Sequence, residues 1–515
     1  MKTETPVKSK SAFAELGMTK TVAALIQEIQ DLYLADDVPW IIGYSGGKDS
    51  TAVLQITWMA ITALPAEKRR KTIHVITTDT LVENPVVATW VERSHSVMRE
   101  AATAQKMPFE TNLLRPQVDE SFWVNLIGKG YPAPRRGLRW CTDRLKIQPS
   151  NRFIRHIITD NGEAILLIGV RKAESSARAR VMERNKKNRM RDRLSPSGTL
   201  PGCLIYSPIE DWSNDDVWIF LMQTPNPWGH DNKSLLTMYQ GASTDGECPL
   251  VVDTTTPSCG DSRFGCWVCT LVELDKSMTA MVQNDQEKEW MMPLLKLRNE
   301  LDVHHDRHLR DFRRMSGLVQ LIDRGDDNGK ELVHGPYTQE TRETWLRKLL
   351  EAQSWIRKNG PKAVQGITLI TLPELQEIRR IWVVEKHEME DILPRIYQEV
   401  TGDPYSGPRL DDNPVFGREE MNILRDVCGD NKLHYELVRE LLSVERQQRA
   451  HVRRSGLFDR LEKSISRHYY EGEADALNMA RRYAAARKSA ESGKREVAYE
   501  STPLELKEAE QPASN

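Results

Sequence analysis

The sequence predicts an α/β fold in which helices cover both faces of a doubly wound parallel sheet. One observation behind this prediction is that short apolar runs alternate with segments of helical pattern in the first half of the chain. Another is that the first apolar run, "PWIIGY" (residues 39–44), leads directly into a glycine-rich loop and a helical segment. The last is a change near residue 275, after which long amphipathic stretches predict a mostly helical C-terminal region.

The expected elements follow the chain in order. The expected strands are residues 39–44, 72–80, 108–116 and 163–171, and the expected helices beside them are 18–35, 49–64 and 85–104. A ligand of such a sheet binds beyond the carboxyl ends of its strands. Because Ser45 and Asp79 both follow strand ends, we expect them to lie at the ligand site.

The same patterns predict how the chain is divided. An N-terminal helical segment (1–35) comes before an α/β domain with a cysteine cluster (36–275), a helical accessory region (276–490) and a polar, disordered tail (491–515). Residues 178–200 form a basic insertion within the α/β domain. Its first part, "RARVMERNKKNRMRDR", holds eight basic and two acidic side chains, and we expect it to be mobile.

Composition sets limits on the kind of protein. The 515 residues contain 72 Lys and Arg against 74 Asp and Glu, so net charge gives no information about a nucleic-acid partner. The N-terminal residues lack the apolar segment of a secretory signal, and no apolar run reaches the roughly 18 residues that span a bilayer. We therefore expect a cytoplasmic protein without a membrane partner. Seven cysteines, an odd number, argue against a disulfide framework.

The loop "SGGKDS" (residues 45–50) has the residues of an anion site. A strand that runs into two glycines and then a helix surrounds an anion with backbone N–H groups and a helix N-terminus. In the common phosphate loop, a Ser or Thr after the lysine ligates Mg²⁺, whereas Asp49 follows Lys48 here. The alternative is an ordinary Gly-Gly turn with a surface lysine, but such a turn would require neither the flanking serines nor the aspartate.

These six residues resemble the pyrophosphate loop of the adenine-nucleotide α-hydrolase-like family. The resemblance implies a sheet of that type and cleavage of ATP between the α- and β-phosphates, with release of pyrophosphate. It also implies Mg²⁺ beside Asp49, and a catalytic role for Lys48 and Asp49, and we expect Lys48 to be an exposed phosphate contact. The residues implied to bind pyrophosphate are Ser45, Gly46, Gly47, Lys48 and Ser50.

Further stretches resemble the phosphoadenosine-phosphosulfate reductase branch of that family, over residues 36–275. "ITTDT" implies that Asp79 and Thr80 lie on the adenine and ribose side, and "GVRKAESSARAR" adds further nucleotide contacts. "RWCTDRLKIQP" and "PIEDWSNDDVWIFL" also match, and in the latter we expect Ser213 to cap a helix. The implied contact residues of "GVRKAESSARAR" are Arg171, Glu174, Ser175 and Arg178. Taken singly, Asp79 reads equally well as a turn residue and Arg171 as a solvated surface residue.

Four cysteines gather within 22 residues: Cys248, Cys259, Cys266 and Cys269. Thiols this dense in a cytosolic chain are more often metal ligands than disulfides. Four thiolates suit either Zn²⁺ or a [4Fe–4S] cluster, and a redox role also stays open.

The resemblance favours the [4Fe–4S] cluster, because adenylylsulfate reductases of this branch hold one with a tandem cysteine pair and a later C-x-x-C. Here Cys141 replaces the tandem pair, so it is either a ligand or a thiol that carries sulfur. We expect Arg139, Arg144 and Lys146 to lower its pKa and keep it a thiolate. The isolated Cys203 and Cys428 read as small core residues.

The loop, the reductase-like domain, the cysteines and the long helical region together resemble the DndC family of DNA phosphorothioation sulfurtransferases. The resemblance implies that sulfur replaces a non-bridging oxygen of a DNA backbone phosphate after activation by ATP. It implies as partners DNA, a cysteine desulfurase as sulfur donor and other subunits of a modification complex, with a role in defence against foreign DNA. A sulfate-assimilation reductase, a tRNA or small-molecule thiolase, and a non-catalytic nucleotide-binding subunit stay open as alternatives.

Overall fold

The computed structural model describes residues 11–174, 176–187, 191, 193–242, 265–323, 330–410, 417–449 and 455–491. The chain forms two compact units. The larger unit comprises Met1–Leu309 and Tyr337–Gly417, and the smaller unit comprises Arg310–Pro336 and Arg418–Asn515. The change of composition near residue 275 therefore lies inside the larger unit and does not separate the two.

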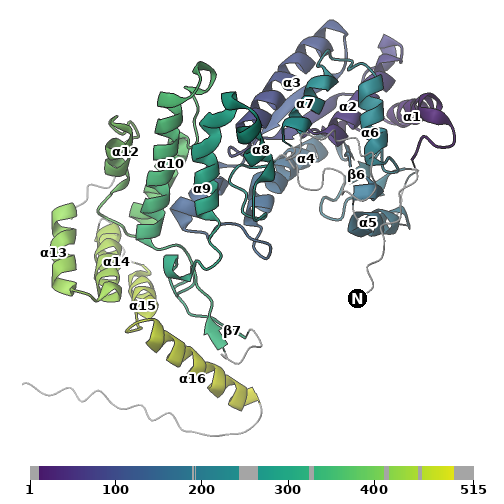
Figure 1. Ribbon diagram of the computed structural model, residues 1–515. Coiled ribbons are helices and arrows are strands. Elements are labelled where there is room, and N and C mark those ends of the chain that lie inside the picture. Colours follow the sequence, from purple (N-terminus) through teal and green to yellow (C-terminus); the bar gives the residue numbers. More distant parts are fainter. Residues whose placement is uncertain are drawn as a thin grey trace, which may run out of the picture. The chain divides into compact units, whose positions relative to one another are not determined.

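A six-stranded sheet with the order β3-β2-β1-β4-β6-β5 forms the centre of the α/β part (Figure 1). Neighbouring strands from β3 to β6 run parallel, and β5 pairs antiparallel with β6 at the edge. The strands are β1 (Trp40–Gly43), β2 (Ile73–Thr78), β3 (Phe109–Leu114), β4 (Ala164–Leu167), β5 (Ser195–Pro196) and β6 (Cys203–Tyr206). The predicted doubly wound parallel sheet is confirmed.

Side chains of β1 enter a different core on each face of the sheet. Trp40 and Ile42 belong to the core that contains most of the α2 side chains, whereas Ile41 packs with Ile154 and Ile157 of α4 on the other face. This alternation follows from the two-residue period of a strand. Both faces are covered, which explains why β1 is apolar throughout.

Helices follow the strands as expected, and α2 is the most buried of them, with twelve buried residues in fifteen. Ser213 caps α6 in a capping box with Asp216, as predicted. The helices of the α/β part are α1 (Gly17–Leu34), α2 (Lys48–Thr62), α3 (Pro85–Ala104), α4 (Gln148–Asn161), α5 (Ser176–Lys187), α6 (Asn214–Gln223) and α7 (Asn232–Gly241).

The basic insertion forms more regular structure than expected. Residues 176–187 are the helix α5, and Lys186 near its end lies 3.6 Å from the Glu210 carboxylate. Lys172, just before the helix, pairs with Glu210 at 3.3 Å as well. An acidic partner outside the stretch therefore neutralises part of the charge of this helix, and the mobility of the insertion stays a prediction.

The rest of the larger unit is helical and shares a core with residues 122–145. Trp123 donates to the backbone of Leu369, Trp382 donates to the backbone of Ile127, and all these groups are buried. The helices here are α8 (Lys276–Asn284), α9 (Met292–Leu301), α10 (Gln339–Asn359), α11 (Leu372–Arg380) and α12 (Leu393–Thr401), with π-helical turns at Val124–Lys129, Thr142–Ile147 and Ile381–Glu385. Figure 1 shows α9 and α10 side by side in this region.

The smaller unit has its own buried polar centre. Arg313, 8% exposed, pairs with Asp311 and Glu436 at 2.6 Å each. Cys428, expected in a core, is only partly buried on α13. The elements are β7 (Leu321–Asp323), β8 (Lys330–Leu332), α13 (Arg418–Cys428), α14 (Lys432–Arg449), α15 (Leu457–Arg467) and α16 (Glu473–Glu491). Among the described helices of both units, none is long and apolar enough to cross a membrane.

Candidate functional site: a nucleotide loop beside a cysteine turn

The glycine-rich loop joins β1 to α2 in a conformation that requires glycine. Gly46 has φ = +76°, and a Cβ there would lie 2.7 Å from Val91 Cγ2 of α3. Gly47 is the N-cap residue of α2 and has no side chain with which to cap the helix. The first turn of α2 thus presents its helix N-terminus to the loop, as anion binding requires.

The two serines of the loop are joined to each other. Ser50 Oγ accepts a hydrogen bond from the Ser45 backbone N–H at 3.2 Å and lies 3.2 Å from Ser45 Oγ. Ser50 Oγ also donates to the Gly47 carbonyl at 3.0 Å. These contacts close the loop into a ring of polar groups around the start of α2.

Lys48 lies differently from our expectation of an exposed phosphate contact. The residue is 9% exposed, and its ammonium lies 3.4 Å from the Asp49 carboxylate and 5.4 Å from the ring centre of Tyr239. The expectation is wrong because α7 brings the Tyr239 ring over the loop. The alternative of a surface lysine in an ordinary turn is excluded by the same burial.

Asp49 is held by a second cation. Arg171 Nε lies 2.6 Å from Asp49 Oδ1, and Arg171 Nη1 donates to the Trp212 carbonyl at 3.3 Å. Arg171 is only 4% exposed, so its interpretation as a solvated surface residue is wrong. The structure thus brings Lys48, Asp49 and Arg171 together at the loop, as the sequence suggested.

Gly169 was not singled out in the sequence, yet it is part of this arrangement. A Cβ on Gly169 would lie 2.8 Å from the Asp49 carbonyl carbon and 3.1 Å from the Ser50 nitrogen. The chain leaving β4 therefore passes directly against the first turn of α2. Its signal in the sequence is its place as the first residue of the "GVRKAESSARAR" stretch.

Arg178 lies on the surface at the start of α5. It forms an ion pair with Glu174, whose Oε2 also accepts from the Arg171 backbone N–H at 3.3 Å. Arg178 is therefore connected to the loop through Glu174 and Arg171. Ser175 lies outside the described residues.

Asp79 and Thr80 follow β2 and face different neighbours. Asp79 pairs with Arg115 at 2.9 Å and accepts from the Leu81 backbone N–H at 2.9 Å, as a turn aspartate does. Thr80 is fully buried, and its hydroxyl lies 3.0 Å from Glu83 Oε1 and 3.4 Å from Cys266 Sγ. The Thr80 side chain therefore contacts the cysteine turn. It does not face the solvent, from which a ribose could approach.

The C-x-x-C pair forms a turn that is bound to the segment after β2. Cys269 N–H donates to the Cys266 carbonyl at 3.0 Å, and the flanking bonds join Asn84 N–H to Gly265 (3.2 Å) and Trp267 N–H to Val82 (2.9 Å). We call residues 265–269 the cysteine turn. Cys248 and Cys259, the other two expected ligands, lie outside the described residues.

Lys146 interacts electrostatically with three cysteine thiols. Its pKa is raised, chiefly by Cys266 and further by Glu83, Cys269 and Cys141. Its ammonium lies 3.7 Å from Glu83 Oε1. Cys141, the N-cap residue of the π-helical turn that contains Lys146, therefore lies in the same neighbourhood as the cysteine turn.

The pKa of Cys141 moves opposite to our expectation. Burial raises the pKa of this thiol, the neighbouring Cys269 raises it further, and Lys146 only partly offsets both. Burial likewise raises the pKa of Cys266 to about 12. Desolvation outweighs the nearby cations, so these thiols are protonated at neutral pH unless a metal or a change of environment removes the proton.

The donor chemistry of this neighbourhood fits a thiophilic metal or cluster, since its thiols are soft ligands. Within the part of the chain that the structure describes, no group of three or more Cys, His, Asp or Glu side chains has the spacing of a metal site. The described residues thus contribute the cysteine turn and Cys141, and the full ligand set stays a prediction.

A buried arginine supports the cysteine turn from the helical region. Arg298 of α9, 1% exposed, donates to the carbonyls of Cys269 (2.9 Å) and Glu273 (3.0 Å) and also to that of Val272. Asp302 pairs with it at 3.1 Å. No sequence pattern identified Arg298, because one arginine in an amphipathic helix is ordinarily a solvated residue.

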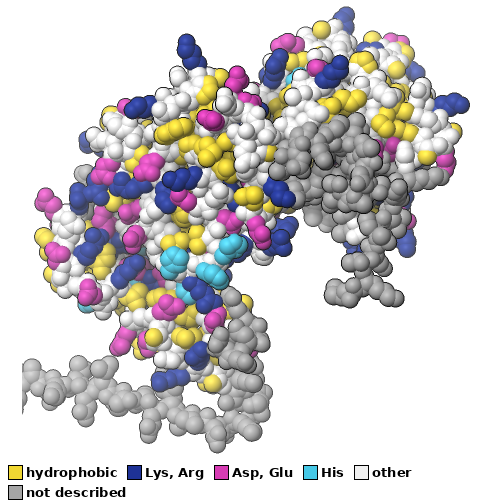
Figure 2. All heavy atoms as spheres, viewed as in Figure 1, with side chains coloured by type: hydrophobic (Ala, Val, Ile, Leu, Met, Phe, Trp, Pro, Cys, Tyr) yellow, Lys and Arg dark blue, Asp and Glu magenta, His cyan; other side chains and the backbone are white. Residues whose placement is uncertain are grey.

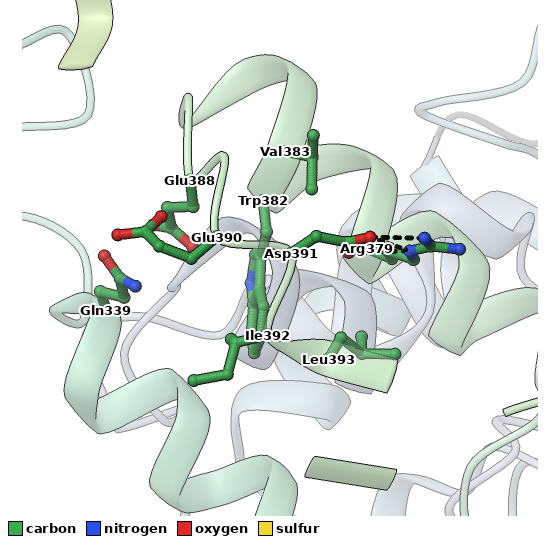
Figure 3. Close-up of a pocket in the computed structure, with 9 residues that line it drawn as sticks. All are labelled: Gln339, Arg379, Trp382, Val383, Glu388, Glu390, Asp391, Ile392 and Leu393. Atoms are coloured by element: carbon green, nitrogen blue, oxygen red, sulfur yellow. Dashed lines mark hydrogen bonds and ion pairs between the residues drawn. The ribbon is translucent and has the colours of Figure 1, made fainter. Parts of the chain in front are cut away.

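Another hollow, shown in Figure 3, lies among α10, α11 and residues 382–393, which follow α11. Arg379 and Asp391 close one side with an ion pair at 2.8 Å, and Gln339, Glu388 and Glu390 lie on the other side of Trp382. It leaves no room for a water-sized molecule. It is therefore a packing defect and no ligand site.

The surface has no single sign of charge on the face that Figure 2 shows, where blue and magenta side chains are interspersed. Some cations near the site already have partners: Arg135 pairs with Asp306, and Arg144 donates to the Tyr131 hydroxyl at 3.1 Å. Arg136 and Arg139, by contrast, are exposed close to Cys141 in the sequence.

The strand–loop–helix on a parallel sheet, with Gly46 and Gly47 at the helix N-terminus, defines a pyrophosphate-loop domain. Residues 39–229 match the family model described as "Phosphoadenosine phosphosulfate reductase domain", so this part of the chain is a phosphoadenosine phosphosulfate reductase-like domain. The match ends before α7 and the cysteine turn.

One curated protein and one solved structure that resemble the chain share little sequence identity with it. It is 26% identical over 246 residues to "Uncharacterized protein MJ0066" of Methanocaldococcus jannaschii, a match that covers 48% of this chain and 39% of that protein. The U34-tRNA thiolase NcsA from Methanococcus maripaludis with its [4Fe-4S] cluster is 12% identical with a TM-score of 0.27, over 56% of this chain and 80% of that one. The chain thus corresponds to well under half of the curated relative.

Proposed function

We propose that this protein is an ATP-using sulfurtransferase that replaces a non-bridging oxygen of a DNA backbone phosphate by sulfur. The observation that supports this proposal is that the nucleotide loop and the cysteine turn lie at the same edge of the sheet. The nucleotide loop follows β1, the cysteine turn is bound to residues 82–84 after β2, and these strands are parallel neighbours. Carboxyl ends of neighbouring parallel strands meet at one edge of a sheet.

The first step would use the loop. ATP binds with Mg²⁺ beside Asp49, and an oxygen of the DNA phosphate attacks the α-phosphorus. A new P–O bond forms, the bond between the α-phosphorus and the bridging oxygen breaks, and pyrophosphate leaves into the loop of residues 45–50. Lys48, the α2 N-terminus and Mg²⁺ offset the charge of the leaving group. Arg171 holds Asp49, and Asp79 and Arg178 are on the nucleotide side.

The second step would use a persulfide on Cys141, loaded by a cysteine desulfurase. Its terminal sulfur attacks the activated DNA phosphorus, and AMP leaves with the electron pair of the broken P–O bond. A second thiolate then attacks the Cys141 sulfur of the S–S bond. The two thiols become a disulfide, and the sulfur stays on DNA with the electron pair.

A [4Fe–4S] cluster is the proposed cofactor, held by Cys266 and Cys269 together with Cys248 and Cys259. When bound, it supplies soft iron that interacts with sulfur. Cys141 is near enough to share the electrostatic neighbourhood of Cys269, which supports a sulfur-carrying thiol beside the cluster.

DNA would approach over the exposed cations near Cys141, Arg136 and Arg139, with the basic residues of α5 as further phosphate contacts. The interspersed charges on the face that Figure 2 shows support the view that other subunits of a modification complex supply DNA recognition. Such a complex would act in the cytoplasm, in defence against foreign DNA.

The test is the chemical state of nucleic acid in cells that contain the protein, its Lys48→Met variant or neither. DNA is digested to dinucleotides, and phosphorothioate linkages are measured by mass spectrometry. We expect them only with the unaltered protein. Thiolated tRNA nucleosides measured in the same cells would, if they alone change, support a tRNA thiolase instead. Phosphorothioate that survives Lys48→Met would support a non-catalytic role for the loop.

A further inference from the structure

The helix α7 lies beyond the matched reductase-like residues, yet one of its side chains contacts the nucleotide loop. The Lys48 backbone N–H donates to the Tyr239 hydroxyl at 3.3 Å, and the Lys48 ammonium lies 5.4 Å from the centre of the same ring. That hydroxyl is also 3.3 Å from the position that a Cβ on Gly47 would take. One side chain therefore touches both the backbone and the charge of the loop lysine.

A second contact fixes α7 relative to α2. Asn232 Nδ2 donates to Gln55 Oε1 at 3.0 Å, and both residues are buried. Gln55 is seven residues after Lys48, and Asn232 is seven residues before Tyr239. Residues seven apart return to the same face of a helix after two turns. The contact between Asn232 and Gln55 therefore lies two helical turns from the contact between Tyr239 and Lys48 on both helices. Because both helices are regular, the Asn232–Gln55 contact sets where Tyr239 lies relative to Lys48.

The Tyr239 ring is itself held in place. It packs edge to face on Trp218 of α6, with ring centres 5.2 Å apart and an angle of 86°. Only 7% of Tyr239 is exposed. A ring fixed in this way offers a constant surface to the lysine ammonium.

The two partners of the Lys48 ammonium, Asp49 and the Tyr239 ring, do not fully neutralise its charge. Its nearest anion, Asp49, is shared with Arg171, which lies closer at 2.6 Å against 3.4 Å for Lys48. The face of the tyrosine ring attracts the ammonium without neutralising it. The positive charge of Lys48 therefore stays available for a phosphate.

We propose that Tyr239 is a positioning residue of the pyrophosphate site, which holds the Lys48 backbone through its amide and so keeps the Lys48 ammonium where it binds the anion. This inference rests on the proposed nucleotide function of the loop and extends the site to α7. It predicts that the reductase-like residues 39–229 lack a complete nucleotide site without this helix.

The test measures Mg·ATP binding by titration calorimetry together with steady-state pyrophosphate release in the presence of DNA, whose phosphate oxygen is the proposed attacking group. Tyr239→Phe removes the hydroxyl and keeps the ring, and we expect the ATP Kd to rise about fivefold, the usual effect of one hydrogen bond. Tyr239→Leu also removes the cation–π contact, and the Kd should rise roughly twentyfold or more. The KM for ATP should follow the Kd, with a smaller change in kcat.

The control is Tyr206→Phe. Tyr206 is another buried tyrosine of this domain, and its hydroxyl bonds to Glu28 of α1 at 2.7 Å. This variant should lower the melting temperature as Tyr239→Phe does while the Kd stays within twofold of the unaltered protein.

The inference on Tyr239 is overturned if either folded Tyr239 variant binds ATP within twofold of the unaltered protein. ATP binding that depends on Tyr239 but yields no pyrophosphate would contradict the proposed function and leave the role of Tyr239 supported. An unaltered protein that binds neither ATP nor pyrophosphate would overturn both.

Discussion

The nucleotide loop and the cysteine turn are built in different ways, although both lie at the carboxyl edge of the same sheet. The loop is formed by consecutive residues, and its glycines, serines and Lys48 take their places within one strand–turn–helix. The cysteine turn depends on partners far apart in the chain: Glu83, Lys146 and Arg298. A site made of consecutive residues can be recognised from its motif, whereas an assembled site needs the fold before its environment exists.

The largest effect should come from Lys48→Met, which removes the loop cation. We expect pyrophosphate release from ATP to fall by roughly a hundredfold or more, since electrostatic groups of this kind contribute that much to a rate. The iron content of the protein should not change. Release of orthophosphate by the unaltered protein would contradict the assignment of the loop.

Cys266→Ser and Cys269→Ser should affect metal binding at the cysteine turn and leave the nucleotide loop unchanged. Anaerobically purified protein should be brown with about four irons per chain, the content of one [4Fe–4S] cluster. Each variant should lose most of this iron and keep its ATP Kd. A colourless protein with one zinc would show that the thiols hold a different metal.

Cys141→Ser separates the two roles open to this residue. Our expectation is that the cluster and pyrophosphate release persist while sulfur incorporation into DNA stops, because four other cysteines suffice for one cluster. Iron and sulfur incorporation are measured on the same preparation. Loss of iron in this variant would make Cys141 a ligand.

Arg298→Lys tests whether the helical region supports the cysteine turn. A lysine keeps the charge but cannot reach three carbonyls at once, so iron content should fall to about half or less with a destabilisation of about 1–3 kcal/mol. Arg342→Lys is the matched control, because Arg342 is also buried and pairs with Glu388 in the same unit. Its iron content per folded chain should be unchanged.

The last prediction concerns stability and His95, which contacts Thr77 Oγ1 at 2.7 Å behind the nucleotide loop. Burial lowers its pKa to about 4, below the roughly 6.5 of an unfolded histidine. The neutral form favours folding, so this contribution is complete above pH 6.5 and is lost as the pH falls toward 4, by up to about 3 kcal/mol. Denaturant unfolding of His95→Asn should show a weaker loss across this range, and an unchanged slope would contradict the assignment.

The fold was predictable where signals are local. The helix Pro85–Ala104 begins and ends where its pattern does, because Asn84 caps it and Pro85 opens it. The short β6 and the two-residue β5 were missed, since so few residues show no period. The expected boundary near 275 followed a real change of composition, but composition does not say which core a helix joins.

The candidate site was predictable in its residues and not in their environments. The motif identified Lys48, yet its burial depends on Tyr239, 191 residues away. Neighbouring cations suggested a low pKa for Cys141, but the burial that reverses the shift exists only in the folded chain. Arg298 and Gly169 act through the backbone of their neighbours, which no pattern of side chains records.

The core shared between residues 122–145 and the later helices has a consequence for cooperativity. Trp123 and Trp382 each donate across to the other segment, and both are buried. Cutting the chain near residue 275 would therefore expose indoles and aliphatic side chains of this shared core. The α/β part and the helices up to residue 417 should behave as one folding unit, and proteolysis should not release the nucleotide domain as a stable fragment.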